Sequence, residues 1–328
     1  MLDMKRRQFI TLLGGAAVPW PLAAWAQQPV KIYRIGFLTA GSGGSPLQQE
    51  FAAALGALGY QENRNVLIER RYAAGDLTRL VDLAHDLVRA GVDVIVTEAT
   101  PAAVAAKEAT ARIPIVMATS GDPVASGLIA SLARPGGNVT GSATLSPELD
   151  RKRLELLREL VPSARRIAFF GNNLNSGEQI GFRGIQAAAA EIGIEAIFIN
   201  ATLPATFEMA FTTMTSRGAD VAVVSPTPTN IEALSQIVGS ATRYRLPAVY
   251  GTREFADAGG LISYGANRLA LSRRAATFVD RILKGAAPAN LPVEQPTKFD
   301  LVVNVKAAKA IGLDIPLTLI ARADEVIE

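Results

Sequence analysis

Small polar side chains follow several of the expected strands, and their chemistry is hydrogen bonding rather than bond making. The candidates in the first half of the chain are Thr39, Ser42, Glu98, Thr100, Thr119, Ser120 and Asp122. Those in the second half are Asn172, Asn173, Thr227, Thr229, Asn230, Tyr250 and Tyr264. Hydroxyl and amide groups with one or two acids suit the ammonium and carboxylate of a small ligand. We therefore predict a binding site for an amino acid or an aromatic or carboxylic acid.

Helix capping is a second interpretation of the same residues. Thr100 precedes Pro101 and Asp122 precedes Pro123, which is the pattern of a capping oxygen followed by proline in the first turn. A helix start that faces a cleft can cap and bind at once. The sequence leaves both roles open.

The sequence contains few residues that could catalyse a reaction. The chain has no cysteine and one histidine, His85, which we place on the polar side of a helix and interpret as a solvated surface residue. Neither a nucleophile elbow nor a phosphate-binding P-loop motif occurs. The glycine-rich stretch 41–46 follows a strand, but Pro46 stands where the dinucleotide fingerprint needs its third glycine. We predict no catalytic residue, no metal and no cofactor.

Alternating strand and helix patterns position the polar residues. The expected strands are 33–38, 65–70, 92–97, 113–118, 138–143, 166–170, 196–199, 219–224, 247–250 and 260–264. The expected helices are 46–58, 77–90, 101–110, 124–133, 147–160, 178–191, 207–217, 230–244 and 269–283. Two such arrays of similar size predict an α/β protein with two doubly wound lobes and a ligand cleft between them.

The first 26 residues have the pattern of an export signal. A basic start at 5–7 precedes an apolar stretch at 9–18 and the sequence Ala24-Trp25-Ala26. We predict cleavage after Ala26 and a periplasmic location; the alternative is a short hydrophobic helix that stays attached. The arginine pair followed by Gln8-Phe9-Ile10 resembles a twin-arginine signal, although the Sec route stays open. No later segment has a dense basic stripe, so we expect no nucleic-acid partner.

Several longer segments carry a family resemblance that spans the whole chain. They are residues 5–15, 121–141, 259–265, 280–285, 291–298 and 323–328. Together they resemble the ABC-transporter substrate-binding proteins that include tryptophan- and tyrosine-binding members. The match is weakest at the expected ligand loops, 39–46, 98–102, 172–177 and 226–230. The resemblance therefore implies a function class and not a particular ligand.

The resemblance implies a type I periplasmic-binding-protein fold with a three-crossover hinge. We place the crossovers near 142–147, 250–254 and 289–296, so that residues 31–145 plus about 253–290 form one lobe, and 146–252 plus about 291–328 the other. It also implies a monomer that carries its ligand to an ABC permease in the membrane. Two alternatives stay open: a ligand sensor that docks on a membrane receptor, and an exported oxidoreductase or hydrolase, which the glycine-rich turn and twin-arginine export would suit.

Overall fold

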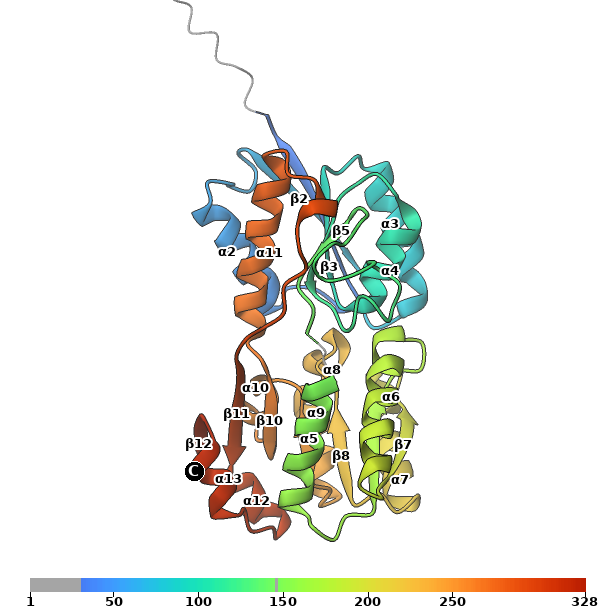
Figure 1. Ribbon diagram of the computed structural model, residues 1–328, viewed down its shortest axis with the longest axis vertical. Coiled ribbons are helices and arrows are strands. Elements are labelled where there is room, and N and C mark those ends of the chain that lie inside the picture. Colours follow the sequence, from blue (N-terminus) through green and yellow to red (C-terminus); the bar gives the residue numbers. More distant parts are fainter. Residues whose placement is uncertain (1–30, 145–146) are drawn as a thin grey trace, which may run out of the picture. The chain divides into compact units, whose positions relative to one another are not determined.

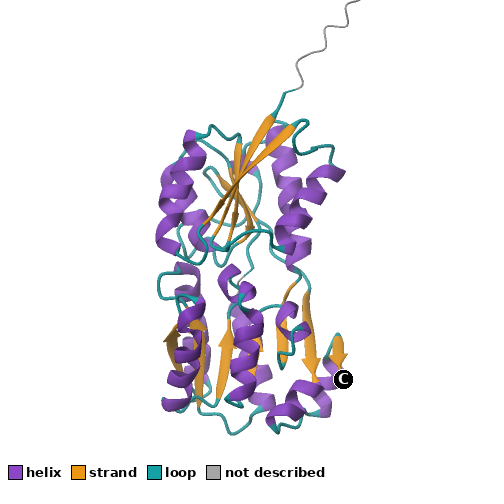
Figure 2. Cartoon of the chain, turned by 180° about the vertical axis from the view of Figure 1, so that it is seen from behind, coloured by secondary structure: helices purple, strands orange, loops and turns teal. Residues whose placement is uncertain are grey.

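The computed structural model describes residues 31–144 and 147–328. The expected signal peptide and its cleavage site lie outside the described residues. Two separate β-sheets, each with helices packed on it, make up the described chain (Figures 1 and 2). The predicted α/β class with two lobes is confirmed.

The first lobe contains a five-stranded parallel sheet in the order β2-β1-β3-β4-β5. Its strands are β1 (Tyr33–Thr39), β2 (Val66–Tyr72), β3 (Val94–Glu98), β4 (Ile115–Thr119) and β5 (Val139–Gly141). Its helices are α2 (Pro46–Ala57), η1 (Leu77–Arg79), α3 (Leu80–Arg89), α4 (Thr100–Ala109), α11 (Arg268–Leu283) and η3 (Pro288–Asn290). β3 and β4 are buried at every position because helices cover both faces of this sheet.

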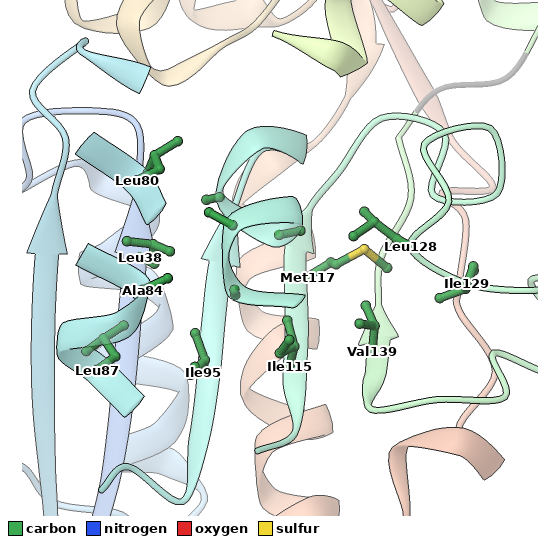
Figure 3. Close-up of a cluster of buried hydrophobic side chains, with 14 of the residues drawn as sticks. Leu38, Leu80, Ala84, Leu87, Ile95, Ile115, Met117, Leu128, Ile129 and Val139 are labelled. Carbon is green, nitrogen blue, oxygen red and sulfur yellow. The ribbon is translucent and has the colours of Figure 1, made fainter. Parts of the chain in front are cut away.

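Two apolar layers form the core of the first lobe. Figure 3 shows one of them, in which Leu80, Ala84 and Leu87 of α3 lie beside Leu38 of β1, and Met117 of β4 lies beside Leu128. On the opposite face, α2 and α11 pack against the sheet and against each other (Figure 1). His85 lies exposed on α3, so the interpretation of a solvated surface histidine is confirmed.

The second lobe contains a seven-stranded sheet in the order β12-β11-β10-β9-β8-β6-β7. Its strands are β6 (Arg166–Gly171), β7 (Glu195–Asn200), β8 (Val221–Val224), β9 (Ala248–Tyr250), β10 (Ile262–Ala266), β11 (Phe299–Asn304) and β12 (Glu325–Ile327). Its helices are α5 (Pro147–Leu160), α6 (Ser176–Glu191), η2 (Pro204–Thr206), α7 (Phe207–Ser216), α8 (Pro228–Glu232), α9 (Leu234–Arg243), α10 (Arg253–Asp257), α12 (Val305–Ile311) and α13 (Leu317–Arg322). β10 and β11 are antiparallel, and the other paired strands are parallel.

The chain passes between the two sheets after β5, after β10 and before β11. The predicted second crossover near 250–254 is wrong, because β10 pairs with β9 on one side and β11 on the other and so belongs to the second sheet. Residues 253–266 therefore lie with the second lobe. Conversely, Val293 and Glu294 hydrogen-bond to Leu132 and Gly141, which keeps residues 291–294 with the first lobe.

The predicted helix 124–133 does not form. The chain makes one turn after Pro123, in which the Gly127 N–H donates to the Val124 carbonyl and the Leu128 N–H donates to the Pro123 carbonyl. Gly127 has a φ of 70°, a left-handed conformation that ends a helical turn. The apolar residues continue at helical spacing past this glycine, but the helical backbone ends there.

Among the helices of the described residues, none is long and apolar enough to cross a membrane.

Candidate ligand-binding site

A cavity of about 90 Å³ lies between residues of the two lobes. One water molecule needs about 10–15 Å³ on this measure, so the cavity has room for a small organic molecule. The first lobe contributes Ala99, Thr100, Thr119, Ser120, Gly121 and Arg268. The second lobe contributes chiefly Leu149, Arg153, Phe169, Asn175, Gly177, Glu178, Val223, Ser225 and Thr227. As expected for open parallel sheets, most of these residues follow the carboxyl ends of strands.

The first-lobe wall consists of the turns after β3 and β4. The Thr100 hydroxyl accepts a hydrogen bond from the Gly121 N–H at 2.9 Å and lies 3.3 Å from the Ser120 hydroxyl. Ala99 is the N-cap of α4 and provides no side-chain acceptor, so this helix start faces the cavity without a cap. Its partial positive charge favours an anionic group of a ligand.

Ala99 also holds an unusual backbone conformation, with φ 72° and ψ 158°. This region is almost exclusive to glycine and costs a non-glycine residue about 1–3 kcal/mol. A hydrogen bond from the Ala99 N–H to the Thr119 carbonyl at 2.8 Å stabilises this strained conformation. The turn is thereby fixed in a shape that brings the start of α4 to the cavity.

The second-lobe wall contains the buried acidic residue Glu178, which is 5% exposed. It accepts hydrogen bonds from the Asn172 N–H at 2.8 Å and from the Ser225 hydroxyl. Among residues 31–144 and 147–328, no cationic group lies within ion-pair distance of Glu178. Burial raises the pKa of Glu178 to about 7, against the opposing effect of these hydrogen bonds.

Two arginines line other parts of the cavity. Arg268 begins α11; one guanidinium nitrogen donates to Glu98 at 2.7 Å, and another lies 3.8 Å from Glu254. Arg153 of α5 is 4% exposed and donates from Nε to the Tyr264 carbonyl at 3.2 Å. The cavity therefore presents positive and negative groups at separate places on its wall.

The remaining wall is apolar. Leu149, Phe169 and Val223 are all buried and line the cavity. Phe169 is held by ring contacts with Phe182 and Phe198 at centroid distances of 5.8 and 5.7 Å. The site thus combines ionic groups with a fixed apolar surface, which suits an amphipathic small molecule.

Comparison with known proteins identifies the family. Residues 43–327 match the family model described as ABC transporter substrate binding protein. The chain belongs to this family. Its members are solute-binding proteins, so membership supports the binding interpretation over the exported enzyme.

Individual relatives agree with this assignment. The tyrosine-binding protein of Clostridioides difficile is 28% identical over 264 residues, which cover 80% of this chain and 75% of the relative. A solved conserved domain protein from Vibrio cholerae is 28% identical with a TM-score of 0.83, covering 90% of this chain and 99% of that one. A Streptococcus pneumoniae ABC domain solved in complex with L-Trp is 26% identical with a TM-score of 0.81, covering 90% and 100%.

More distant structures share the fold alone. The branched-chain amino acid binding protein LivJ of Streptococcus pneumoniae, solved with isoleucine, is 16% identical with a TM-score of 0.53, covering 79% of this chain and 86% of that one. The predicted type I periplasmic-binding-protein fold and the predicted family are confirmed.

Half of the predicted ligand residues of this binding protein come together around the cavity. Thr100, Thr119, Ser120 and Thr227 line it. Asn172, Thr229 and Asn230 line a smaller adjoining cavity of about 10 Å³, which shares Glu178 with the larger one and has room for about one water. Thr39 and Glu98 lie behind the wall, where the Thr39 hydroxyl donates to Glu98 at 3.0 Å and Glu98 holds Arg268.

The other five predicted residues also line neither cavity. Asp122 accepts hydrogen bonds from the Val124 and Ala125 N–H groups, so it caps a turn. Tyr250 is buried against Phe255 because the alternation of β9 points it at the core. Tyr264 packs on Phe299. The backbone N–H groups of Ser42 and Asn173 donate to the side chains of Glu232 and Asn200.

The charged residues that line the cavity, Glu178, Arg153 and Arg268, are not among those predicted from the sequence. Glu178 lies in the first turn of α6, close to the predicted asparagines Asn172 and Asn173. Arg153 follows two other basic residues on α5, Arg151 and Lys152, which are more exposed. The way in which α5 packs on the sheet decides which of these three basic residues is buried at the cavity. The sequence of one charged helix does not show how that helix packs.

Proposed function

We propose that this protein is the extracytoplasmic solute-binding component of an ABC importer. It binds an α-amino acid with an apolar or aromatic side chain in the cavity between its lobes and delivers it, as a monomer, to a membrane permease. The observation that carries this proposal is the buried carboxylate of Glu178, which lines the cavity without a cationic partner among the described residues.

Burying an ionised carboxylate without a counter-charge is costly. An ammonium group bound in the cavity would supply that charge and turn the cost into an attraction. The uncapped start of α4 and the guanidinium groups of Arg153 and Arg268 suit the carboxylate of the same ligand. Leu149, Phe169 and Val223 suit its side chain.

The relatives support this ligand class. One is named a tyrosine-binding protein, and another was solved in complex with L-Trp. The proposed function needs no reaction and no cofactor. Its location follows from the export signal, which we propose is removed after Ala26.

The test is ligand binding to residues 27–328, measured by calorimetry with each of the twenty common L-amino acids. We expect an aromatic amino acid to bind, and Glu178→Gln to weaken that binding at least about tenfold, since one buried charge pair is lost. Glu191→Gln removes an exposed carboxylate from the same helix and should leave binding unchanged.

An analogue that lacks the amino group isolates the role of Glu178. Wild-type protein should prefer L-tryptophan to indole-3-propionic acid, and Glu178→Gln should lose this preference. Failure of every amino acid to bind, or equal binding by the wild type and Glu178→Gln, would overturn the proposal.

A further inference from the structure

The glycine-rich loop of residues 41–45 has no side chain in either cavity, although its sequence singles it out. Within the loop, the Gly44 N–H donates to Gln48 Oε1 at 3.1 Å. Gly43 has a φ of 96° and lies against the Tyr72 ring, where a Cβ atom would come within 2.5 Å of the ring. These contacts determine the conformation of the loop at Gly43 and Gly44, but they do not explain why glycine and serine occupy positions 41 and 42.

Gly41 and Ser42 contact the second lobe. The Ser42 N–H donates to Oε1 of Glu232, the last residue of α8, at 2.6 Å. A Cβ atom on Gly41 would collide with the same carboxylate and lie 3.2 Å from Cβ of Pro228. Gly41 does not have a positive φ, so this position needs glycine for space and not for backbone conformation. The space is occupied by the other lobe.

Glu232 is a solvent-exposed residue outside the cavity. In the part of the chain that the structure describes, no basic side chain forms an ion pair with it. Its carboxylate instead accepts the backbone N–H of the loop. A hydrogen bond to a charged acceptor is stronger than a neutral one, so this contact contributes to holding the lobes together.

α8 connects this contact to the ligand cavity. Its cap, Thr227, lines both cavities, and its five residues lead from there to Glu232. At about 1.5 Å per residue, the helix separates the two places by roughly 7 Å. A ligand against Thr227 and the loop against Glu232 therefore act on opposite ends of one short element.

We propose that Glu232, with Gly41 and Ser42, forms a clasp that holds the two lobes closed over the ligand and so sets the ligand's residence time. The clasp rests on the proposed function. Glu232 is a positioning residue in this scheme, since it acts on the lobes and does not touch the ligand. Because the clasp forms only when the lobes meet, its loss should accelerate dissociation and spare the encounter step.

The kinetic test uses L-tryptophan as the probe. Both tryptophans of the chain, Trp20 and Trp25, precede the expected cleavage site, so in residues 27–328 the fluorescence of the ligand reports binding directly. For Glu232→Ala we expect the dissociation rate to rise about tenfold with the association rate within about twofold. Glu232→Gln keeps an acceptor oxygen and should lie between Glu232→Ala and wild type.

A steric variant tests the loop side of the clasp. Gly41→Ala should also accelerate dissociation, because its methyl group occupies the space of Glu232 and Pro228. Gly56→Ala is the matched control, since a Cβ atom there meets no atom within 4 Å. Unfolding in urea should show equal stability of the free Gly41→Ala protein and wild type, which separates the clasp from a structural role.

A measurement without ligand keeps the clasp testable if L-tryptophan does not bind. The chain has no cysteine, so spin labels can be placed through Glu108→Cys in the first lobe and Met209→Cys in the second, both exposed. We expect Glu232→Ala and Gly41→Ala to shift the label distances toward longer values. Unchanged label distances in both variants would overturn the clasp whether or not L-tryptophan binds, whereas absence of binding by wild type would count against the proposed ligand alone.

Discussion

The protonation state of one buried carboxylate controls the charge of the site. Glu178 is held by the Asn172 N–H and the Ser225 hydroxyl, and burial raises its pKa from the ordinary value of 4.5 to about 7. The site therefore gains a negative charge as the pH rises through about 7.

The affinity for an amino acid should follow this charge. We expect binding of L-tryptophan to be strongest above about pH 7 and to fall below it by up to about tenfold per pH unit, because the ammonium then competes with a proton for Glu178. Calorimetry between pH 5 and pH 8 measures this effect. In Glu178→Gln the same pH series should be flat; a slope that persists in this variant would place the titrating group elsewhere.

The stability of the ligand-free protein should change in the opposite direction. Since the folded-state pKa is raised, the folded protein binds this proton more tightly than the unfolded chain between about pH 4.5 and 7. The contribution of Glu178 to stability is therefore fully present below pH 4.5 and is lost as the pH rises to about 7. Ligand binding compensates for this loss where the carboxylate is ionised.

At the scale of elements, helix capping and ligand binding fall to different residues in the turns after β3 and β4, whereas the sequence left both roles open for each residue. Asp122 caps the turn that begins at Pro123, with both hydrogen bonds at 2.9 Å, and lies outside the cavity. Ser120 lines the cavity and is not a cap. Thr100 is likewise no N-cap, because α4 begins at Thr100 itself.

Alanine variants should separate these roles. We expect Asp122→Ala to lower the free energy of unfolding by about 1 kcal/mol, the usual cost of losing a cap, with ligand affinity unchanged. Ser120→Ala should weaken ligand binding while changing stability little. Urea unfolding and calorimetry on both variants check the pair, and the reverse pattern would exchange the two assignments.

At the scale of the whole molecule, the two lobes are separate packing units that three passes of the chain connect. Ion pairs and hydrogen bonds cross between them at Glu254 and Arg268, and at Ser42 and Glu232. The ligand cavity belongs to neither lobe alone. Ligand affinity should therefore depend on residues of both lobes, as the clasp variants test.

Export is the prediction that concerns the full chain. Mass spectrometry of the protein recovered from the periplasm should find Gln27 as the first residue. Replacing Arg6 and Arg7 together by lysine should block export by the twin-arginine route, because that route requires the arginine pair. Undiminished export of the lysine variant would instead indicate the Sec route, and protein that begins at Met1 would contradict cleavage.

The sequence by itself determined the α/β class, the two lobes and the family, because these follow from local periodicity and from motifs read along the chain. It also indicated a polar site at the strand ends. The predicted helix 124–133 was wrong because one glycine ends the turn there. The predicted crossover before β10 was wrong because the sheet to which β10 belongs depends on its distant partner β11.

Only the tertiary structure decided which charges form the site. Glu98 and Arg268 are 170 residues apart and meet 2.7 Å from each other, and burial selects Arg153 from three adjacent basic residues. Glu178 becomes distinctive only because neighbouring strands and helices remove it from water. Charge pairing and desolvation depend on contacts between distant segments, whereas strand and helix patterns depend on neighbours in the chain.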